Sequence, residues 1–202
     1  MAEYRGAYDL TEVAFIEEAE ATQGTTPTAG AWKPIPVVTA FDPKFNPKIK
    51  RKVGLGNFKP VSLHTVKKEF TLDMEMDLVA KSSNPAFEWL ELAYYAISNS
   101  TFANTFALTK RLKTISVGAK YDLATDEYEL LKGCMINKLA LSGSAEDENP
   151  LKMALNFDAL NMVPIGTTDY VSGTATRNNA VSSTQAYITM ADVDIQVNAG
   201  SA

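Results

Sequence analysis

Residues 69–78 constrain the fold of this chain most strongly, because apolar and polar side chains alternate there without a break. In a β-strand, successive side chains point to opposite faces of the sheet. The segment therefore predicts a strand with one apolar face and one largely acidic face. The apolar positions are Phe70, Leu72, Met74, Met76 and Leu78, and the other face carries Glu69, Thr71, Asp73, Glu75 and Asp77.

The acidic face is unusual because Asp and Glu are poor strand formers. Asp73, Glu75 and Asp77 occupy every second position, which places same-face neighbours only about 7 Å apart. Their carboxylates repel one another unless water or cations screen the charges. Two interpretations follow. The face is either an ordinary solvated sheet face, or a surface kept negative for a purpose, such as not binding another polyanion.

Charge is strongly segregated along the chain, whose net charge is −5. Residues 1–43 contain seven acids and two bases, residues 44–68 contain eight bases and no acid, and residues 69–202 contain nine bases and seventeen acids. The basic block 44–68 has three interpretations: a latch onto an acidic patch of another copy, a solvated loop, or a nucleic-acid patch. Few aromatic residues accompany it for base stacking, so we favour the latch.

The chain is predicted to be a single domain over residues 1–202. Small residues and prolines predict an N-terminal arm over 1–36. Prolines and glycines in 42–60 predict a long basic loop or a splayed hairpin.

The remaining segment, 61–197, is expected to form a mainly-β core. Several alternating segments favour a β-sandwich or barrel of two packed antiparallel sheets. One flanking α-helix is predicted at about 84–98, with Asn84 as its N-cap and Pro85 in its first turn. A strand irregularity is expected at Gly133.

Residues that could carry chemistry are scarce. His64 is the only histidine and Cys134 the only cysteine, so a zinc site with several histidines is excluded. No nucleophile elbow, Walker loop or Cys-x-x-Cys pair occurs. Cys134 lies in a strand-like run and is expected to be a buried thiol. We therefore predict that the protein is not an enzyme and holds no cofactor or metal. No apolar run reaches the ~20 residues that a membrane helix needs.

The order and character of these segments resemble the tail tube (major tail) proteins of long-tailed bacteriophages and related tailed viruses. In residues 131–158, a strand ends in Leu-Ala-Leu-Ser, a polar tip with three acids follows, and a return strand alternates toward Phe157. The opening segment 6–18 is similar to the N-terminal arms of such subunits. The resemblance rests on segment order rather than on a diagnostic motif.

The resemblance implies a β-sandwich, with a flanking helix and long interface arms, that assembles into hexameric rings. The rings stack head to tail into a hollow tube that conducts DNA during genome ejection. The expected partners are further copies of the chain, tail terminator, tape-measure and baseplate or tip proteins, and viral DNA that passes without specific binding. The expected location is the tail of the virion, after assembly in the host cytoplasm and without membrane contact.

The resemblance also implies roles for the charged residues. The residues assigned to the lumen, where a negative wall lets a polyanion slide, are Asp73, Glu75 and Asp77, with Asp192 and Asp194 as secondary candidates. The residues assigned to the interface between rings are Lys48, Lys50, Arg51 and Lys52, opposite acidic patches near 9–20 or 146–148. The basic block is therefore expected at ring interfaces or outside the tube, away from the channel.

Two alternatives stay open at the level of the sequence. A β-sandwich binding module, such as a capsid decoration or adhesion domain, has the same kind of strand pattern. A tube subunit of a non-viral injection system would share the expected fold.

Overall fold

A computed structural model of the chain describes residues 10–35, 38–53, 60–80, 114–143, 150–177 and 186–187; a few side chains, chiefly those of 49–53 and 60–67, are excepted. Several predictions lie outside these residues and stay predictions: the helix at 84–98, the acidic residues 146–148, and Asp192 and Asp194.

The described part is mainly β, as predicted, with one short 3-10 helix, η2 (Glu20–Thr22). The longer strands are β1 (Leu10–Glu17), β3 (Val38–Val53), β4 (Pro60–Asp77), β6 (Ile115–Tyr121), β7 (Glu127–Ser142), β8 (Lys152–Ala159) and β9 (Asn161–Gly166). The short strands are β2 (Ala31–Pro34), β5 (Val79–Ala80), β10 (Thr176–Arg177) and β11 (Ala186–Tyr187). Among the described residues, no helix is long and apolar enough to cross a membrane.

Nine strands form one continuous sheet, where the sequence had suggested two sheets. Its order is β10-β2-β1-β6-β7-β8-β4-β3, with β9 paired to β7, while β5 and β11 pair separately. All neighbours in the large sheet are antiparallel except β10 and β2. The strand β7 joins two halves, because its first part pairs with β6 and β9 and its second part with β8.

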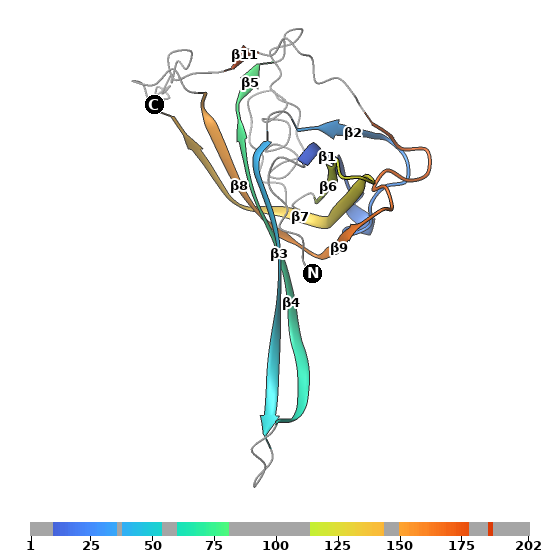
Figure 1. Cartoon of the computed structure of the whole chain (residues 1–202), viewed down its shortest axis with the longest axis vertical. Helices are drawn as coiled ribbons and strands as arrows, with labels where there is room; N and C mark the ends of the chain where they lie inside the picture. The colour runs from blue at the N-terminus through green and yellow to red at the C-terminus, as the bar shows by residue number, and fades with distance from the viewer. Residues whose placement is uncertain are drawn as a thin grey trace, which may run out of the picture.

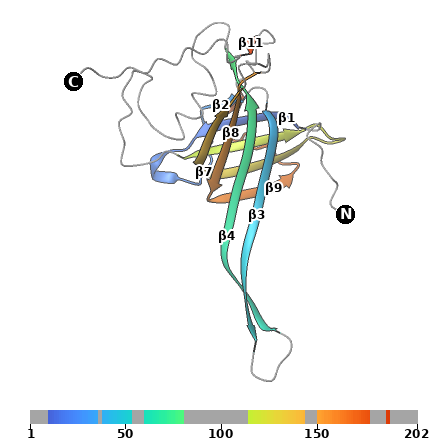
Figure 2. The ribbon, with the colours of Figure 1, turned by 90° about the vertical axis from the view of Figure 1, so that its left-hand side faces the viewer.

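The two halves of the sheet lie as two layers whose strands cross steeply (Figure 2). We call β3, β4, β8 and the second part of β7 the hairpin layer, and β2, β1, β6, β9 and the first part of β7 the β1 layer. Steep crossing is typical of layers that share a strand which bends from one to the other.

The bend in β7 lies at Gly133, where the irregularity was expected. Gly133 has a φ of 65°, a backbone conformation that favours glycine. A Cβ atom there would lie only 2.6 Å from Cδ1 of Leu160. The pairing of β7 with β6 also loses its regular register in this part of the strand. Gly133 therefore lets one strand serve both layers.

The core lies between the two layers. Leu72, Met74 and Met76 of β4 are fully buried, whereas Glu75 on the opposite face is exposed, so the predicted alternation is confirmed. They share one apolar cluster with side chains from the facing strands. The cluster includes Val13, Phe15, Ile115 and Val117 of the facing β1 layer, together with Met153, Leu155 and Phe157 of β8, the neighbour of β4 in the same layer.

Two parts of the predicted N-terminal arm are instead strands of the large sheet, β1 and β2, whereas residues 23–30 between them form a loop, as expected. Of the two strands, β1 is an internal strand between β2 and β6, and its residues Val13 to Ile16 are all buried. Val13 and Phe15 face the main core, whereas Ala14 and Ile16 belong to a second cluster with Trp32 and Tyr170. Because both faces of β1 are covered, it lacks the alternation that marks a strand with one wet face.

Residues 42–53 of the predicted basic loop lie in β3, and β4 begins at Pro60, so the described part of 42–60 agrees with the splayed-hairpin alternative. β3 and β4 continue past the end of β8, where Ala159 pairs with Phe70, and project from the body as a two-stranded hairpin (Figure 1). Pro43 and Pro47 are tolerated because β3 is the last strand of the sheet, and edge strands can accept proline.

Candidate functional site

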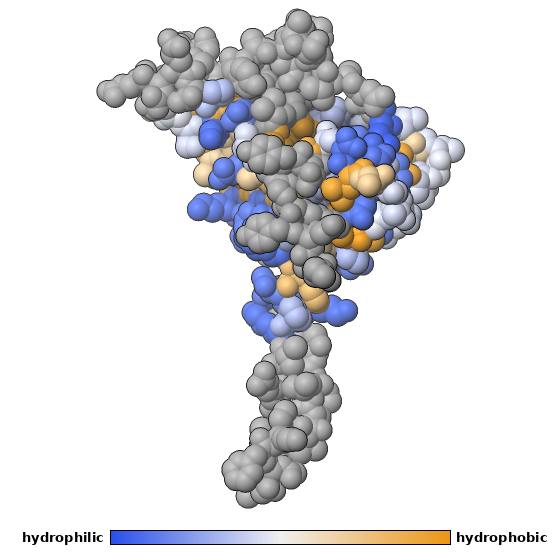
Figure 3. All heavy atoms as spheres, viewed as in Figure 1, coloured by the Kyte–Doolittle hydropathy of each residue, from blue (hydrophilic) through white to orange (hydrophobic). Residues whose placement is uncertain are grey.

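The hairpin layer turns its outward face away from the core, and we call this surface the polar face. Strand register assigns to it, among residues with described side chains, the carboxylates Asp42, Glu69, Asp73, Glu75, Asp77 and Asp158 and the lysines Lys44, Lys48, Lys138 and Lys152. Six carboxylates and four lysines give a formal net charge of −2. Hydrophilic residues gather over β7 and β8 and where the hairpin leaves the body (Figure 3).

Asp73 lies at the centre of a small ionic network on this face. The ammonium group of Lys44 lies 2.6 Å from Oδ2 of Asp73 and 2.9 Å from Oδ2 of Asp42. Nδ2 of Asn156 donates to Oδ1 of Asp73 at 2.5 Å. The hydrogen bonds from Lys44 and then Asn156 hold the pKa of Asp73 below its ordinary value. Asp73 is thus ionised but locally neutralised.

The basic block was expected at ring interfaces or outside the tube, and this stays a prediction; the structure shows that its first two lysines share a face with the acidic residues. Besides Lys44, Lys48 reaches this face, and its Nζ lies 2.7 Å from Oε1 of Glu69. Sequence reasoning missed both pairs because the partners are 29 and 21 residues apart and meet only through the β3–β4 register. Lys50, Arg51 and Lys52 lie in β3 on the projecting hairpin, and their side chains are outside the described set.

Glu75 and Asp77 keep the polar face negative. Glu75 is exposed and has Ala40 and Ala154 as its cross-strand neighbours. Asp77 pairs in register with Lys152, and its Oδ1 is buried without a hydrogen-bond partner among the described residues. The three predicted lumen residues therefore share one face, and of these Asp73 alone has a close cationic partner among the described residues.

Both lateral edges of the hairpin layer are open within the part of the chain that the structure describes. β3 pairs with β4 on one side only. Residues 135–142 of β7 pair with β8 but have no strand on their other side, since the pairing with β6 ends at Cys134. Open edges present unpaired backbone N–H and C=O groups, which other strands can bind.

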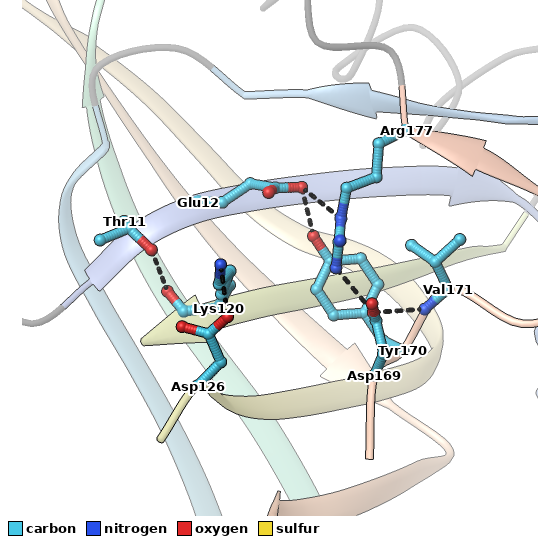
Figure 4. Close-up of polar contacts among 8 residues, drawn as sticks. All are labelled: Thr11, Glu12, Lys120, Asp126, Asp169, Tyr170, Val171 and Arg177. Carbon is cyan, nitrogen blue, oxygen red and sulfur yellow. Dashed lines mark hydrogen bonds and ion pairs between the residues drawn. The ribbon is translucent and has the colours of Figure 1, made fainter. Parts of the chain in front are cut away.

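A second polar network closes the outer side of the β1 layer (Figure 4). Tyr170 donates from its hydroxyl to Oε1 of Glu12 at 2.6 Å. Arg177 lies 3.2 Å from the same oxygen and 2.6 Å from Oδ1 of Asp169. Its guanidinium also lies over the rings of Tyr128 and Tyr170. These contacts hold segment 169–177 against the β1 layer, so the network has a structural role, although Nε of Arg177 is buried without a hydrogen bond to any described residue.

A third polar feature is the buried carboxylate of Glu18, only 2% exposed. Its Oε1 accepts hydrogen bonds from Ser116 Oγ at 2.6 Å and Gly133 N at 2.8 Å. Its Oε2 accepts from Gly24 N at 2.6 Å and Thr114 Oγ1 at 2.8 Å. Four donors around one carboxylate tie the end of β1 to β6 and to the bend of β7.

Groups suited to catalysis do not converge in the described part of the chain. No cluster of three or more His, Cys, Asp and Glu side chains there could hold a metal ion. Cys134 is fully buried, as predicted, and burial raises the pKa of its thiol above the ordinary value. The polar face with its two open edges is therefore the best candidate for function.

Comparison with known proteins gives a match at the level of fold only. No family model and no curated protein sequence matches the chain. A chain of the six-fold symmetrised cryo-EM structure of the anti-feeding prophage baseplate superposes with a TM-score of 0.50 at 12% identity, covering 84% of this chain and 100% of that chain. A chain of the PVC sheath–tube complex, an extracellular contractile injection system in its extended state, gives a TM-score of 0.44 at 11% identity, covering 83% and 95%.

Proposed function

We propose that the chain is a structural, non-catalytic subunit of a phage-like tail or injection particle, in which copies form hexameric rings that stack into a tube. One observation carries the proposal: in the part of the chain that the structure describes, the four-stranded hairpin layer is open at both edges and has a hydrophilic outward face. Pairing of such edges between copies is a common mode of assembly. The fold shared with a chain of a six-fold symmetrised baseplate supports the number six.

The strand directions of the hairpin layer fit a closed ring. Every pair in this layer is antiparallel, so β3 and β7 at its two edges run in opposite directions. Rotation about an axis roughly parallel to the strands preserves these directions. It brings the β3 edge of one copy beside the β7 edge of the next in antiparallel orientation. Ring closure then leaves no free edge in this layer.

The polar face would line the inside of such a ring. The β1 layer covers the other face of the sheet, and this added bulk favours a position on the wider, outer side. The interior would then carry a net charge of −2 per copy on this face. A negative wall offers a polyanion such as DNA few cationic contacts that release counterions, so the polyanion slides without binding.

Electron microscopy of the purified chain at rising concentration, together with mass photometry, tests the proposal. Sixfold rings or hollow tubes are the expected result. A dimer as the final state would contradict the proposal, because it would indicate that one edge pairs only with itself. Monomers that persist both alone and with fragments of an assembled tail as nuclei would favour the β-sandwich binding module instead.

A further inference from the structure

One row of polar residues crosses the whole hairpin layer from edge to edge. Asp42 on β3 pairs in register with Asp73 on β4, Asp73 with Asn156 on β8, and Asn156 with Lys138 on β7. These four side chains therefore lie at one level and on one face of the sheet. The row begins with a carboxylate at one open edge and ends with an ammonium group at the other.

The middle of the row is satisfied within the chain, whereas its ends are exposed. Asn156 and Lys44 bind Asp73, and Lys44 also reaches Asp42. The side chain of Asp42 nevertheless remains 60% exposed. Lys138 is exposed and makes no ion pair with any described residue.

Rows of apolar side chains also cross the core side of the same layer, and the residues at the two ends of each row are not fully buried. One row runs Phe41, Met74, Leu155, Leu139 across the four strands, and the next runs Val38, Met76, Met153, Leu141. The central members are buried, but Leu141 at the β7 edge is 54% exposed. A neighbouring β3 edge at the same level would cover Leu141 with Val38 and Leu139 with Phe41.

We propose that the ring is held in register by an ion pair between Asp42 of one copy and Lys138 of the next, backed by the Leu141–Val38 and Leu139–Phe41 contacts. This inference rests on the proposed ring. A ring rotation without stagger places Lys138 of one copy opposite Asp42 of its neighbour, because both lie at one level. A stagger of two residues would instead put Lys138 beside Ala40, which has no charge, or beside Lys44, which repels it.

A charge exchange tests the ion pair. Asp42→Lys and Lys138→Glu each place like charges at the contact and should weaken every subunit contact by about two- to fivefold, the range for exposed pairs. The double variant restores opposite charges, so its assembly midpoint in sedimentation velocity should return to that of the wild type. Lys152→Glu is the matched control, because it makes the same charge change on the same face but on the interior strand β8.

Cysteine cross-linking tests the register independently. Chains with Lys138→Cys are mixed with chains carrying Ala40→Cys, Asp42→Cys or Lys44→Cys, and the disulfide should form fastest with Asp42→Cys. Faster linkage at Ala40 or Lys44, or a double charge variant no better than the single ones, would overturn the inference while the ring stands. A wild type that forms no rings, and no cross-link in any mixture, would instead overturn the proposed function itself.

Discussion

At the scale of single residues, Glu18 is the least expected feature, because a buried carboxylate usually has a cationic partner. Here four hydrogen-bond donors take that place, two on each oxygen. Two of the donors are backbone N–H groups, of Gly24 and Gly133. A hydroxyl group can rotate and accept a hydrogen bond instead of donating one, but a backbone N–H can only donate. The N–H groups of Gly24 and Gly133 therefore require an acceptor at both oxygens of Glu18, which a carboxylate supplies.

Glu18→Gln should therefore destabilise the chain strongly. The new amide group replaces one carboxylate oxygen and faces the N–H of either Gly24 or Gly133, which loses its acceptor. We expect the free energy of unfolding to fall by roughly 2–4 kcal/mol, measured by urea denaturation at a concentration below assembly. Glu75→Gln is the control at an exposed position and should change it by less than about 0.5 kcal/mol. Equal effects of the two variants would refute the structural role of Glu18.

Asp73 predicts a specific dependence of stability on pH. Its pKa in the folded chain is lowered from 3.8 by the hydrogen bonds from Lys44 and Asn156. The network thus contributes stability that is fully present above the ordinary pKa and is lost as the pH falls through the lower folded value. The contribution is modest, since the carboxylate is half exposed and screened by water.

Asp73→Asn should accordingly make the free energy of unfolding depend less on pH in the acid range. The variant should be less stable than the wild type at neutral pH, and the difference should shrink as the pH falls below about 4. Urea denaturation across this range measures it, and added salt should reduce the difference at neutral pH. Asp158→Asn serves as the control, because Asp158 lies on the same face without a described ion pair. A constant difference at all pH values would contradict the ionic origin.

At the scale of elements, the bend of β7 depends on Gly133. Gly133→Ala forces a Cβ against Leu160 and strains a backbone with a φ of 65°. We expect a loss of roughly 1–3 kcal/mol in the free energy of unfolding. Gly166→Ala is the matched control, since its added Cβ would meet no atom closer than 3.9 Å. Full stability of Gly133→Ala would mean that the bend does not need glycine.

The same scale explains which elements could be predicted from the sequence. The alternation of 69–78 and the irregularity at Gly133 are local signals, and both were found. The strand β1 was missed because its Val13 to Ile16 run is buried on both faces and thus carries no period of two. Burial on a second face depends on Trp32 and Tyr170, which arrive from distant parts of the chain.

At the scale of the whole molecule, the polar face was predicted only in part. Its acids were visible as a pattern on one strand, but Lys44 and Asn156, which bind Asp73, and Lys138, which lies beside Asn156, become neighbours only through strand order. The sequence predicts a largely acidic face on this strand, and the register places it in a face of mixed charge with a small negative excess among the described side chains. If this face lines the proposed tube, the repulsion of DNA would depend most on the acids without a close cation among the described residues.

Reversing Glu75 and Asp77 to lysine should consequently change how the assembled particle interacts with DNA. The two changes turn a net charge of −2 per copy into +2 on this face. Reversed tubes should retain DNA at low salt and release it as salt rises, because counterion release then favours binding. Tubes with Glu75→Gln and Asp77→Asn are the control for shape. DNA delivery that is unchanged in the reversed tubes would refute the lumen assignment.

In the proposed assembly, contacts within a ring and contacts between rings would involve different charged residues. The β3–β4 hairpin projects from one end of the body and carries Lys50, Arg51 and Lys52 (Figure 1), so it is suited to contact along the tube axis. The proposed Asp42–Lys138 pair would act within the ring. Reversing the three hairpin bases to glutamate should therefore leave rings intact but shorten the tubes, as high salt should for the wild type. Lys138→Glu should instead lower the fraction of the protein that assembles into rings.

Two outcomes would contradict this prediction. Equal tube lengths at low and high salt would show that charge does not drive stacking. A loss of rings when the three hairpin bases are reversed would place the hairpin within the ring contact.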